Sequence, residues 1–180
     1  WLNDYALYKV LKQINNNRSW ENFPVDHRNY DAEVLAGLEN QHEHEINFIY
    51  WLQWKLFCQL KQIKEYASLK GIYIMGDLPF LVSRDSADVW SHQKYFRLDL
   101  SSGAPPDLYF ALGQKWGMPP YDWERIACDG FNYLQKRLKL AENFYHMYRI
   151  DHFVGLFRLW TSKYDDSSPG SIGGSYLPHE

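Results

Sequence analysis

The stretch GIYIMGDLP, residues 71–79, decides the fold because it joins a helix stop to a strand and then to a carboxylate. Residues 72–75 are apolar at every position and include β-branched isoleucines, a pattern typical of a strand covered on both faces in a parallel sheet. Gly71 is the residue type that most often ends a helix. The stretch therefore predicts a helix, a glycine and a buried strand, which together make half of a βαβ unit.

The segments before Gly71 have helical periodicity. Residues 1–14 have apolar positions on one face, with an Asn-Asp pair that we expect to cap the helix, and a shorter helical pattern surrounds residues 34–38. The strongest pattern predicts one long amphipathic helix from about Glu43 to Lys70. Its apolar residues step by three or four: Ile49, Leu52, Leu56, Leu60, Ile63 and Ala67. Residues 1–70 are therefore expected to be mainly helical.

A second helix and strand follow further along the chain. Residues 121–145 return to helical spacing, with a break expected at Gly130, and MYRI at residues 147–150 resembles another buried strand. Residues 71–160 would then hold two strands of one parallel sheet. Between them, residues 99–121 are rich in glycine, proline and aromatic residues and predict a long irregular loop, which is more often functional than not. Residues 161–180 are interpreted as a Gly/Ser-rich tail that is truncated and forms no further element.

The composition argues against several classes of partner. The chain has 180 residues and a net charge of −3, so it offers no basic field for nucleic acid and no polybasic segment for anionic lipid. No apolar run reaches the roughly 20 residues that span a bilayer. Cys58 and Cys128 lack metal-ligand spacing, so we interpret both as small core residues of a cytoplasmic protein. The 8 Trp and 14 Tyr residues leave aromatic rings available for a flat, partly polar ligand.

Both predicted strands are followed by an aspartate. Asp77 and Asp151 would project from neighbouring strands into one site, because the carboxyl ends of parallel strands form the ligand face of α/β proteins. Arg149 precedes Asp151 by two positions and shares its side of the strand. Such a cation favours an ionised carboxylate, the form that attacks an acetal carbon. Helix or turn capping for each aspartate, and an ordinary ion pair for Arg149, remain the alternative interpretations.

Three blocks of the sequence together resemble a known enzyme family. They are GDLPFLVSRDSADVW (residues 76–90), GAPPDLYFALGQKWGMPPYDW (residues 103–123) and YRIDHFVG (residues 148–155). Their order and spacing are similar to those of the 4-alpha-glucanotransferases called amylomaltases or disproportionating enzymes, glycoside hydrolase family 77. The resemblance implies an α/β fold, a (β/α)8 TIM barrel with helical insertions, and no metal or organic cofactor. It also implies transfer of alpha-1,4-glucan segments from a maltooligosaccharide donor to an acceptor.

The resemblance implies roles for individual residues. Asp151 matches the nucleophile that forms a covalent glucosyl-enzyme, and Arg149 matches the arginine that supports it. His152 belongs to the same block, and Asp77 matches an aspartate that contacts sugar hydroxyls near the cleavage point. The loop over the acceptor side supplies the other expected substrate-binding residues: Asp107, Tyr109 and Trp116.

Simple chemistry agrees with these roles, and alternatives remain. An indole face packs on the apolar face of a glucose ring, while carboxylates and arginine bind its hydroxyls. Trp116 is alternatively a packing residue that pins its loop. Ser86 and Asp88 are interpreted as caps of the helix that begins near residue 87 rather than as sugar ligands.

The chain departs from the family pattern at two places and lacks part of it. Leu108 and Tyr109 replace a Tyr-Phe pair, and Met118 stands where an asparagine is usual, which predicts altered acceptor contacts. A retaining mechanism also needs a second carboxylic acid about 5 Å from the nucleophile. In the family, that glutamate and a stabilising aspartate follow the strand of Asp151. The acidic residues of the tail match neither of them: Asp165, Asp166 and Glu180.

We therefore interpret the chain as an N-terminal-to-middle fragment of an incomplete barrel, inactive alone, within a protein that is a glucanotransferase. A second hypothesis is a non-catalytic alpha-glucan-binding protein derived from this fold. A third is an unrelated α/β domain whose aspartates are caps.

Overall fold

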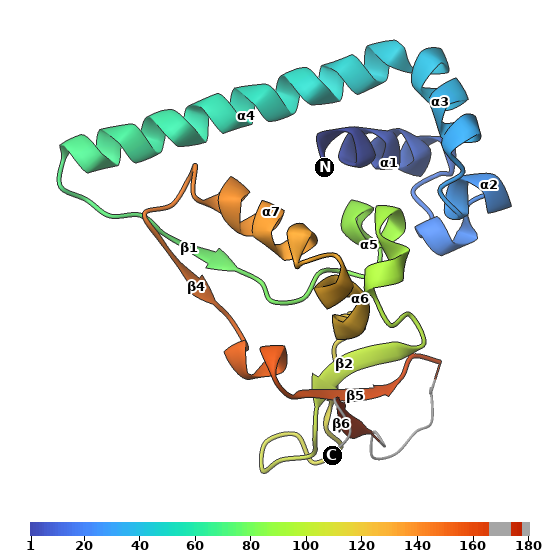
Figure 1. Ribbon diagram of the computed structural model, residues 1–180, viewed down its shortest axis with the longest axis vertical. Coiled ribbons are helices and arrows are strands. Elements are labelled where there is room, and N and C mark those ends of the chain that lie inside the picture. The colour runs from blue at the N-terminus through green and yellow to red at the C-terminus, as the bar shows by residue number, and fades with distance from the viewer. Residues whose placement is uncertain (166–173, 178–180) are drawn as a thin grey trace.

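The computed structural model describes residues 1–165 and 174–177, which form a helical first part followed by two separate small sheets (Figure 1). The first part ends in a single long helix that runs along one side of the molecule. The helices over residues 2–14 and 43–69 agree with the predicted periodicities. The elements before residue 71 are α1 (Leu2–Ile14), the 3-10 turn η1 (Trp20–Asn22), α2 (Val25–Arg28), α3 (Ala32–Gln41) and α4 (Glu43–Leu69).

The end of α4 is closed by glycine as predicted. Gly71 adopts a left-handed φ of +68°. This conformation has little energetic cost for glycine, because glycine has no Cβ. The Ile72 N–H then donates to the Ala67 carbonyl at 2.9 Å, and the Gly71 N–H donates to the Ser68 carbonyl at 3.1 Å. These two bonds satisfy carbonyl groups of the last helical turn. At the other end of the helical region, the predicted Asn-Asp cap of α1 is wrong, because Trp1 occupies the N-cap without a side-chain bond.

The first sheet consists of the parallel strands β1 (Met75–Leu78) and β4 (Met147–Ile150), which lie side by side in Figure 1. Their register places Asp77 opposite Arg149. The two aspartate-bearing strands are therefore neighbours, as predicted. In the described part of the chain, β4 is the one strand that pairs with β1.

The expected extent and burial of the first strand are wrong. The strand begins at Met75 rather than Ile72, so Asp77 lies inside it instead of after it. The Ile74 N–H donates to Nδ1 of His146 at 3.0 Å instead of to a strand. Ile72, Tyr73 and Met75 are also exposed, by 59%, 73% and 65%, and among the described residues only β4 pairs with β1.

The second sheet is antiparallel and was not expected. Its order is β3-β2-β5-β6, built from β2 (Leu100–Ala104), β3 (Gln114–Lys115), β5 (Leu159–Lys163) and β6 (Ser175–Leu177). Residues 99–121 are therefore not wholly irregular, and the chain does form strand after residue 160. The sequence hides these strands because their buried side chains are small and polar. These are Ser101, Ser102, Thr161 and Ser162.

Short helices connect the sheets. Gly130 has φ +63° and separates α6 (Trp123–Cys128) from α7 (Asn132–Ala141), as predicted. Helix α5 (Ala87–Ser91) begins at Ser86, whose hydroxyl accepts from the Val89 N–H at 3.3 Å, so the predicted serine cap is confirmed. Asp88 does not cap the helix; its carboxylate accepts from the Tyr133 hydroxyl at 3.0 Å. The remaining 3-10 turns are η2 (Gln93–Tyr95) and η3 (Phe153–Leu156).

The core lies where α1 meets α5. Trp90 is fully buried, and its ring lies 4.9 Å from that of Tyr30 and 5.7 Å from that of Tyr8. The two cysteines do not belong to this core: Cys128 is exposed and Cys58 is half-buried, which corrects our interpretation. They occupy α6 and α4, whose outer sides face solvent. Among the described residues, no helix is long and apolar enough to cross a bilayer.

Candidate active site

The carboxyl end of the β1–β4 pair brings together Asp77, Arg149 and Asp151. The guanidinium of Arg149 donates to both carboxylate oxygens of Asp77, at 3.1 Å from Nε and 2.6 Å from Nη2. The same Nη2 lies 3.5 Å from Oδ1 of Asp151. Arg149 therefore lies between the two aspartates, and the parallel register explains why it reaches across to the neighbouring strand.

The electrostatics of this cluster favour its charged form. The hydrogen bond from Arg149 holds the pKa of Asp77 below its usual range, and Asp77 and then Asp151 raise the pKa of Arg149. The side chains of Asp77 and Arg149 are 54% and 58% exposed, so solvent screens their attraction. Arg149 was expected to support Asp151 above all, but its two-pronged contact is with Asp77.

His152 connects this cluster to the second sheet. Its backbone has a left-handed φ of +50°, and its ring stands perpendicular to the indole of Trp116 with centroids 5.0 Å apart. The ring of Phe80 also lies near the His152 ring, with centroids 6.3 Å apart. Gly155 permits this arrangement, because a Cβ there would lie 2.6 Å from the His152 ring. The site histidine is thus held by aromatic neighbours, and the structure places it next to Trp116.

Trp116 is half-buried, and both its indole N–H and its backbone N–H donate hydrogen bonds. Its Nε1–H donates to the side-chain oxygen of Gln114 at 3.1 Å, and its backbone N–H donates to the Ser102 carbonyl at 2.9 Å. These contacts support the interpretation that Trp116 pins its loop. Stacking of its indole on a sugar stays a prediction.

Asp107 and Tyr109 lie at the tip of the 105–113 loop, away from the aspartate cluster in sequence and in contacts. Oδ1 of Asp107 accepts from the N–H groups of Tyr109 and Phe110, at 2.8 and 2.6 Å, which closes a tight turn. Tyr109 is 86% exposed and Leu108 is 92% exposed. The carboxylate of Asp107 therefore shapes the turn, and the exposed rings and side chains around it are free to meet a ligand.

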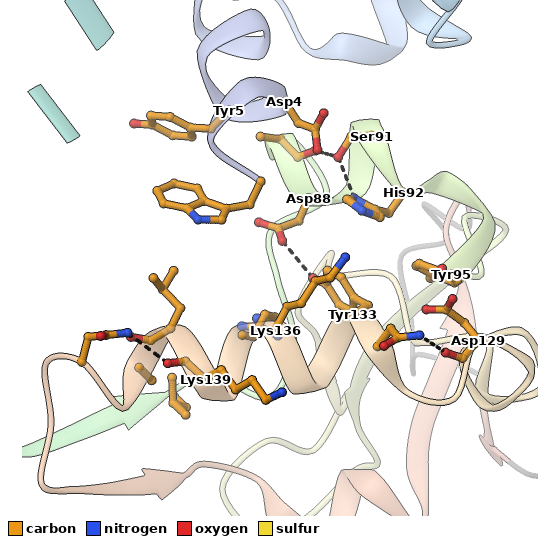
Figure 2. Close-up of a pocket in the computed structure, with 18 of the residues that line it drawn as sticks. Asp4, Tyr5, Asp88, Ser91, His92, Tyr95, Asp129, Tyr133, Lys136 and Lys139 are labelled. Carbon is orange, nitrogen blue, oxygen red and sulfur yellow. Dashed lines mark hydrogen bonds between the residues drawn. The ribbon is translucent and has the colours of Figure 1, made fainter. Parts of the chain in front are cut away.

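A cavity of about 960 Å³ lies elsewhere, between α1, α5 and α7 (Figure 2). Tyr5, Asp88, His92 and Lys136 are among its lining residues, and none of the predicted site residues is. Burial lowers the pKa of His92. The sequence did not indicate this cavity because its walls come from three separate helices. It is therefore distinct from the predicted site.

The aspartate cluster has the composition of a site for acid, base or nucleophilic chemistry. It offers carboxylate oxygens held open to solvent and a fixed guanidinium donor. In the described part of the chain, no group of three or more His, Cys, Asp or Glu residues is placed to hold a metal ion.

Comparison with known proteins shows the family to which the chain belongs. Residues 1–177 match the family model described as 4-alpha-glucanotransferase, so the match includes both strands and the 105–113 loop. The chain belongs to this family. The family membership agrees with the resemblance of the three sequence blocks around Asp77, Trp116 and Asp151.

Curated members of the family are similar over nearly the whole chain. The 4-alpha-glucanotransferase of Chlamydia muridarum is 42% identical over 164 residues, which cover 89% of this chain and 30% of that protein. The enzyme of the same name from Thermus thermophilus is 34% identical over 183 residues, which cover 98% and 36%. The chain thus spans about a third of the length of the curated relatives it matches.

Solved amylomaltases have the same fold. The amylomaltase from Streptococcus agalactiae in complex with acarbose superimposes with a TM-score of 0.91 at 30% identity, covering 99% of this chain and 37% of that one. The amylomaltase from Corynebacterium glutamicum superimposes with a TM-score of 0.77 at 28% identity, covering 99% and 23%. This 4-alpha-glucanotransferase family member therefore shares the mixed α/β fold of amylomaltases.

Proposed function

We propose that the complete natural protein is a 4-alpha-glucanotransferase that transfers alpha-1,4-glucan segments between maltodextrins by a retaining double displacement. One structural observation supports the proposal in addition to family membership. Asp151 follows a strand that pairs in parallel with the strand of Asp77, and Arg149 bridges the two carboxylates. Two carboxylates and a cation at one open sheet end suit a sugar with several hydroxyl groups.

In the proposed first step, a carboxylate oxygen of Asp151 attacks the anomeric carbon and the glycosidic C–O bond breaks. An acid protonates the leaving oxygen, and a glycosyl ester of Asp151 remains. In the second step, a hydroxyl of the acceptor sugar attacks that carbon, gives its proton to the same group, now a base, and frees Asp151. Asp77 and Arg149 bind hydroxyl groups near the reacting carbon, and no step requires a metal.

We further propose that the acid/base lies outside residues 1–180, within a (β/α)8 barrel that the rest of the protein completes. The support is the exposure of the β1–β4 pair. Large apolar side chains beside both strands face solvent, as expected of a sheet whose other neighbours are missing. These are Ile72, Tyr73, Met75, Met147, Phe153, Val154 and Phe157. The 180 residues alone are then inactive.

The proposed partners are maltooligosaccharide donors and acceptors. The neighbouring amylomaltase was solved with acarbose, a sugar-like ligand, which supports an oligosaccharide substrate for this chain. The exposed Leu108 and Tyr109 are proposed to contact the acceptor. We also propose a cytoplasmic location, since Cys58 and Cys128 are both free thiols.

The test is incubation of the complete protein with maltotriose, followed by chromatography of the products. A transferase produces glucose together with maltodextrins longer than the substrate. A protein that only binds glucans retains maltodextrin affinity and yields no product, which would overturn the proposal. Residues 1–180 alone are expected to give no product in the same assay.

A further inference from the structure

Arg84, in the segment after β1, binds several parts of the chain at once. Its Nε and Nη2 donate to the carboxylate of Glu21, at 3.1 Å and 2.7 Å, and its Nη1 donates to the Leu98 carbonyl at 2.9 Å. Its guanidinium also lies over the ring of Tyr164, 3.5 Å from the centroid. The side chain is only 11% exposed. Nothing in the proposed chemistry uses this buried cation.

Asp85, the next residue, fastens the same segment to the helical region. Its carboxylate accepts from the Tyr8 hydroxyl and from Nζ of Lys12, both at 2.6 Å, and from the Trp20 N–H at 3.2 Å. The Trp20 indole donates back to the Arg84 carbonyl at 2.8 Å. The Arg84-Asp85 step is therefore fixed to α1 and η1, so Arg84 extends from a rigid base.

Tyr164 joins Arg84 to the antiparallel sheet. The centroid of its ring lies 3.5 Å from the Arg84 guanidinium carbon and 5.8 Å from Nζ of Lys115. The Tyr164 N–H donates to the Asp99 carbonyl at 3.0 Å, just before β2, and its carbonyl accepts from Nζ of Lys115 in β3. Through its backbone Tyr164 thus connects the end of β5 to the start of β2 and to Lys115 of β3, and through its ring it contacts Arg84 and Lys115.

Strand β3 leads directly into the site. Lys115 precedes Trp116, whose ring contacts His152 beside Asp151. Strands β2 and β3 also form the two sides of the 105–113 loop. The contacts of Tyr164 with Arg84 and Lys115 therefore hold the base of that loop.

We propose that Arg84 and Tyr164 are positioning residues that hold the 105–113 loop over the acceptor side and so set the ratio of sugar transfer to hydrolysis. The inference rests on the proposed function. The glucosyl-enzyme can react with a sugar hydroxyl or with water, and only a loop held in place excludes water. Loosening the loop base leaves cleavage of the donor intact and allows water to compete with the acceptor hydroxyl for the anomeric carbon of the glycosyl ester.

The experiment uses the complete protein with maltotriose, and measures longer maltodextrins as transfer and net reducing ends as hydrolysis. Tyr164→Leu removes the ring, and Tyr164→Phe keeps the ring that both cations contact. Arg84→Gln removes the positive charge and the two-pronged hydrogen bond to Glu21. Arg97→Gln is the matched control, because Arg97 forms an exposed two-pronged pair with Asp99 near the same strand without contacting Tyr164.

Tyr164→Leu and Arg84→Gln are expected to lower the transfer-to-hydrolysis ratio about fivefold, the size of effect that a buried cation–aromatic contact supports. Tyr164→Phe and Arg97→Gln are expected to keep the wild-type ratio. Total maltotriose cleavage should change less than twofold in every variant that folds, as judged by thermal unfolding.

An unchanged ratio in both Tyr164→Leu and Arg84→Gln would overturn the inference while leaving the proposed function intact. A fall in cleavage and transfer together, at constant ratio, would assign these residues a purely structural role. Absence of transfer by the wild-type protein would instead reject the proposed function. If Arg84→Gln fails to fold, the contrast between Tyr164→Leu and Tyr164→Phe decides the matter.

Discussion

The two sheets of this chain differ in how well their side chains are buried and in the residues that they carry. The antiparallel sheet buries its small polar residues, including Ser101 at 0% and Thr161 at 3% exposure, and hydrogen-bonds across four strands. The parallel β1–β4 pair has two strands and exposes both the apolar and the charged side chains along it. The proposed catalytic groups thus lie on the less supported sheet, and the more supported one carries the 105–113 loop.

Each sheet also carries a similar ion pair, which makes the comparison testable. Arg149 binds Asp77 across the parallel strands, and Arg97 binds Asp99 two residues away at the start of β2. Both arginines use Nε and Nη2, and all four side chains are more than 40% exposed. The two ion pairs have similar geometry. If removing one arginine lowers activity and removing the other does not, the difference reflects a role in the chemistry rather than in stability.

The largest expected effect is at the end of β4. Replacing Asp151 by Asn removes the nucleophile, so transfer from maltotriose should fall at least about 1,000-fold. Maltodextrin affinity, measured by calorimetry, should remain. Asp26→Asn, an exposed substitution on α2, is the control with unchanged activity. If the Asp151→Asn variant retains transfer activity within tenfold of wild type, Asp151 is not the nucleophile and the β1–β4 pair does not carry the catalytic groups.

The next effect contrasts glycines of the two sheets. A Cβ at Gly103 in β2 would lie 1.9 Å from the backbone oxygen of Gln114, whereas one at Gly76 in β1 would meet the Tyr145 ring at 2.3 Å. A ring can turn aside and a strand backbone cannot. Gly103→Ala should therefore lower the free energy of unfolding by about 3 kcal/mol, and Gly76→Ala by about 1 kcal/mol. Urea unfolding that ranks the two in the opposite order would contradict this contrast.

A third prediction compares the two arginines. Arg149→Gln should reduce kcat/KM for transfer about 10- to 100-fold, because the substrate loses a positioned donor beside Asp151. Arg97→Gln should change it less than twofold. Thermal unfolding should shift little for either, since exposed ion pairs contribute about 0–1 kcal/mol. Equal losses of activity in the two variants would show that the pair on β1–β4 has no special role.

The smallest effect concerns pH. The arginine hydrogen bond holds the pKa of Asp77 and that of Asp99 below the usual value, so each pair stabilises the fold above the unfolded pKa of about 3.9. That stabilisation is lost as the pH falls through the lower folded pKa. Arg149→Gln should raise the pKa of Asp77 and not that of Asp99, and Arg97→Gln should do the reverse. Carbon-13 NMR titration of the carboxyl groups measures both, and a shift at the wrong aspartate would disprove the assigned pairing.

The sequence predicted the features that depend on local pattern. Helix α4 follows from apolar steps of three and four and from Gly71, and the adjacency of Asp77 and Asp151 follows from two apolar runs that each lead to aspartate. The interpretation of Asp77 as a residue beyond its strand was wrong, because the Ile74 N–H binds His146 and the strand begins later. Apolar composition predicts a strand, whereas its first residue depends on distant partners.

The antiparallel sheet and the Arg84–Tyr164 contact could not be predicted in the same way. LSSGA in β2 has low strand propensity, and its serines are buried in a strand that pairs with β3 and β5. The Ser101 hydroxyl accepts from the N–H of Gly117, which follows β3, at 2.9 Å. Arg84 and Asp85 resemble ordinary polar loop residues. Apart from the Leu98 carbonyl, their partners lie more than 60 positions away in sequence, so no local pattern reveals them.

The register of β1 and β4 has a consequence for how the protein is made. Asp77 and Arg149 are separated by 72 positions. At a synthesis rate of roughly 5–20 residues per second, Asp77 is added to the chain about 4–14 seconds before Arg149. During that interval β1 has apolar neighbours but no parallel partner among the described strands. The nascent chain therefore depends on its helices, and on any chaperone that shields Met75, to stay unaggregated until the second strand arrives.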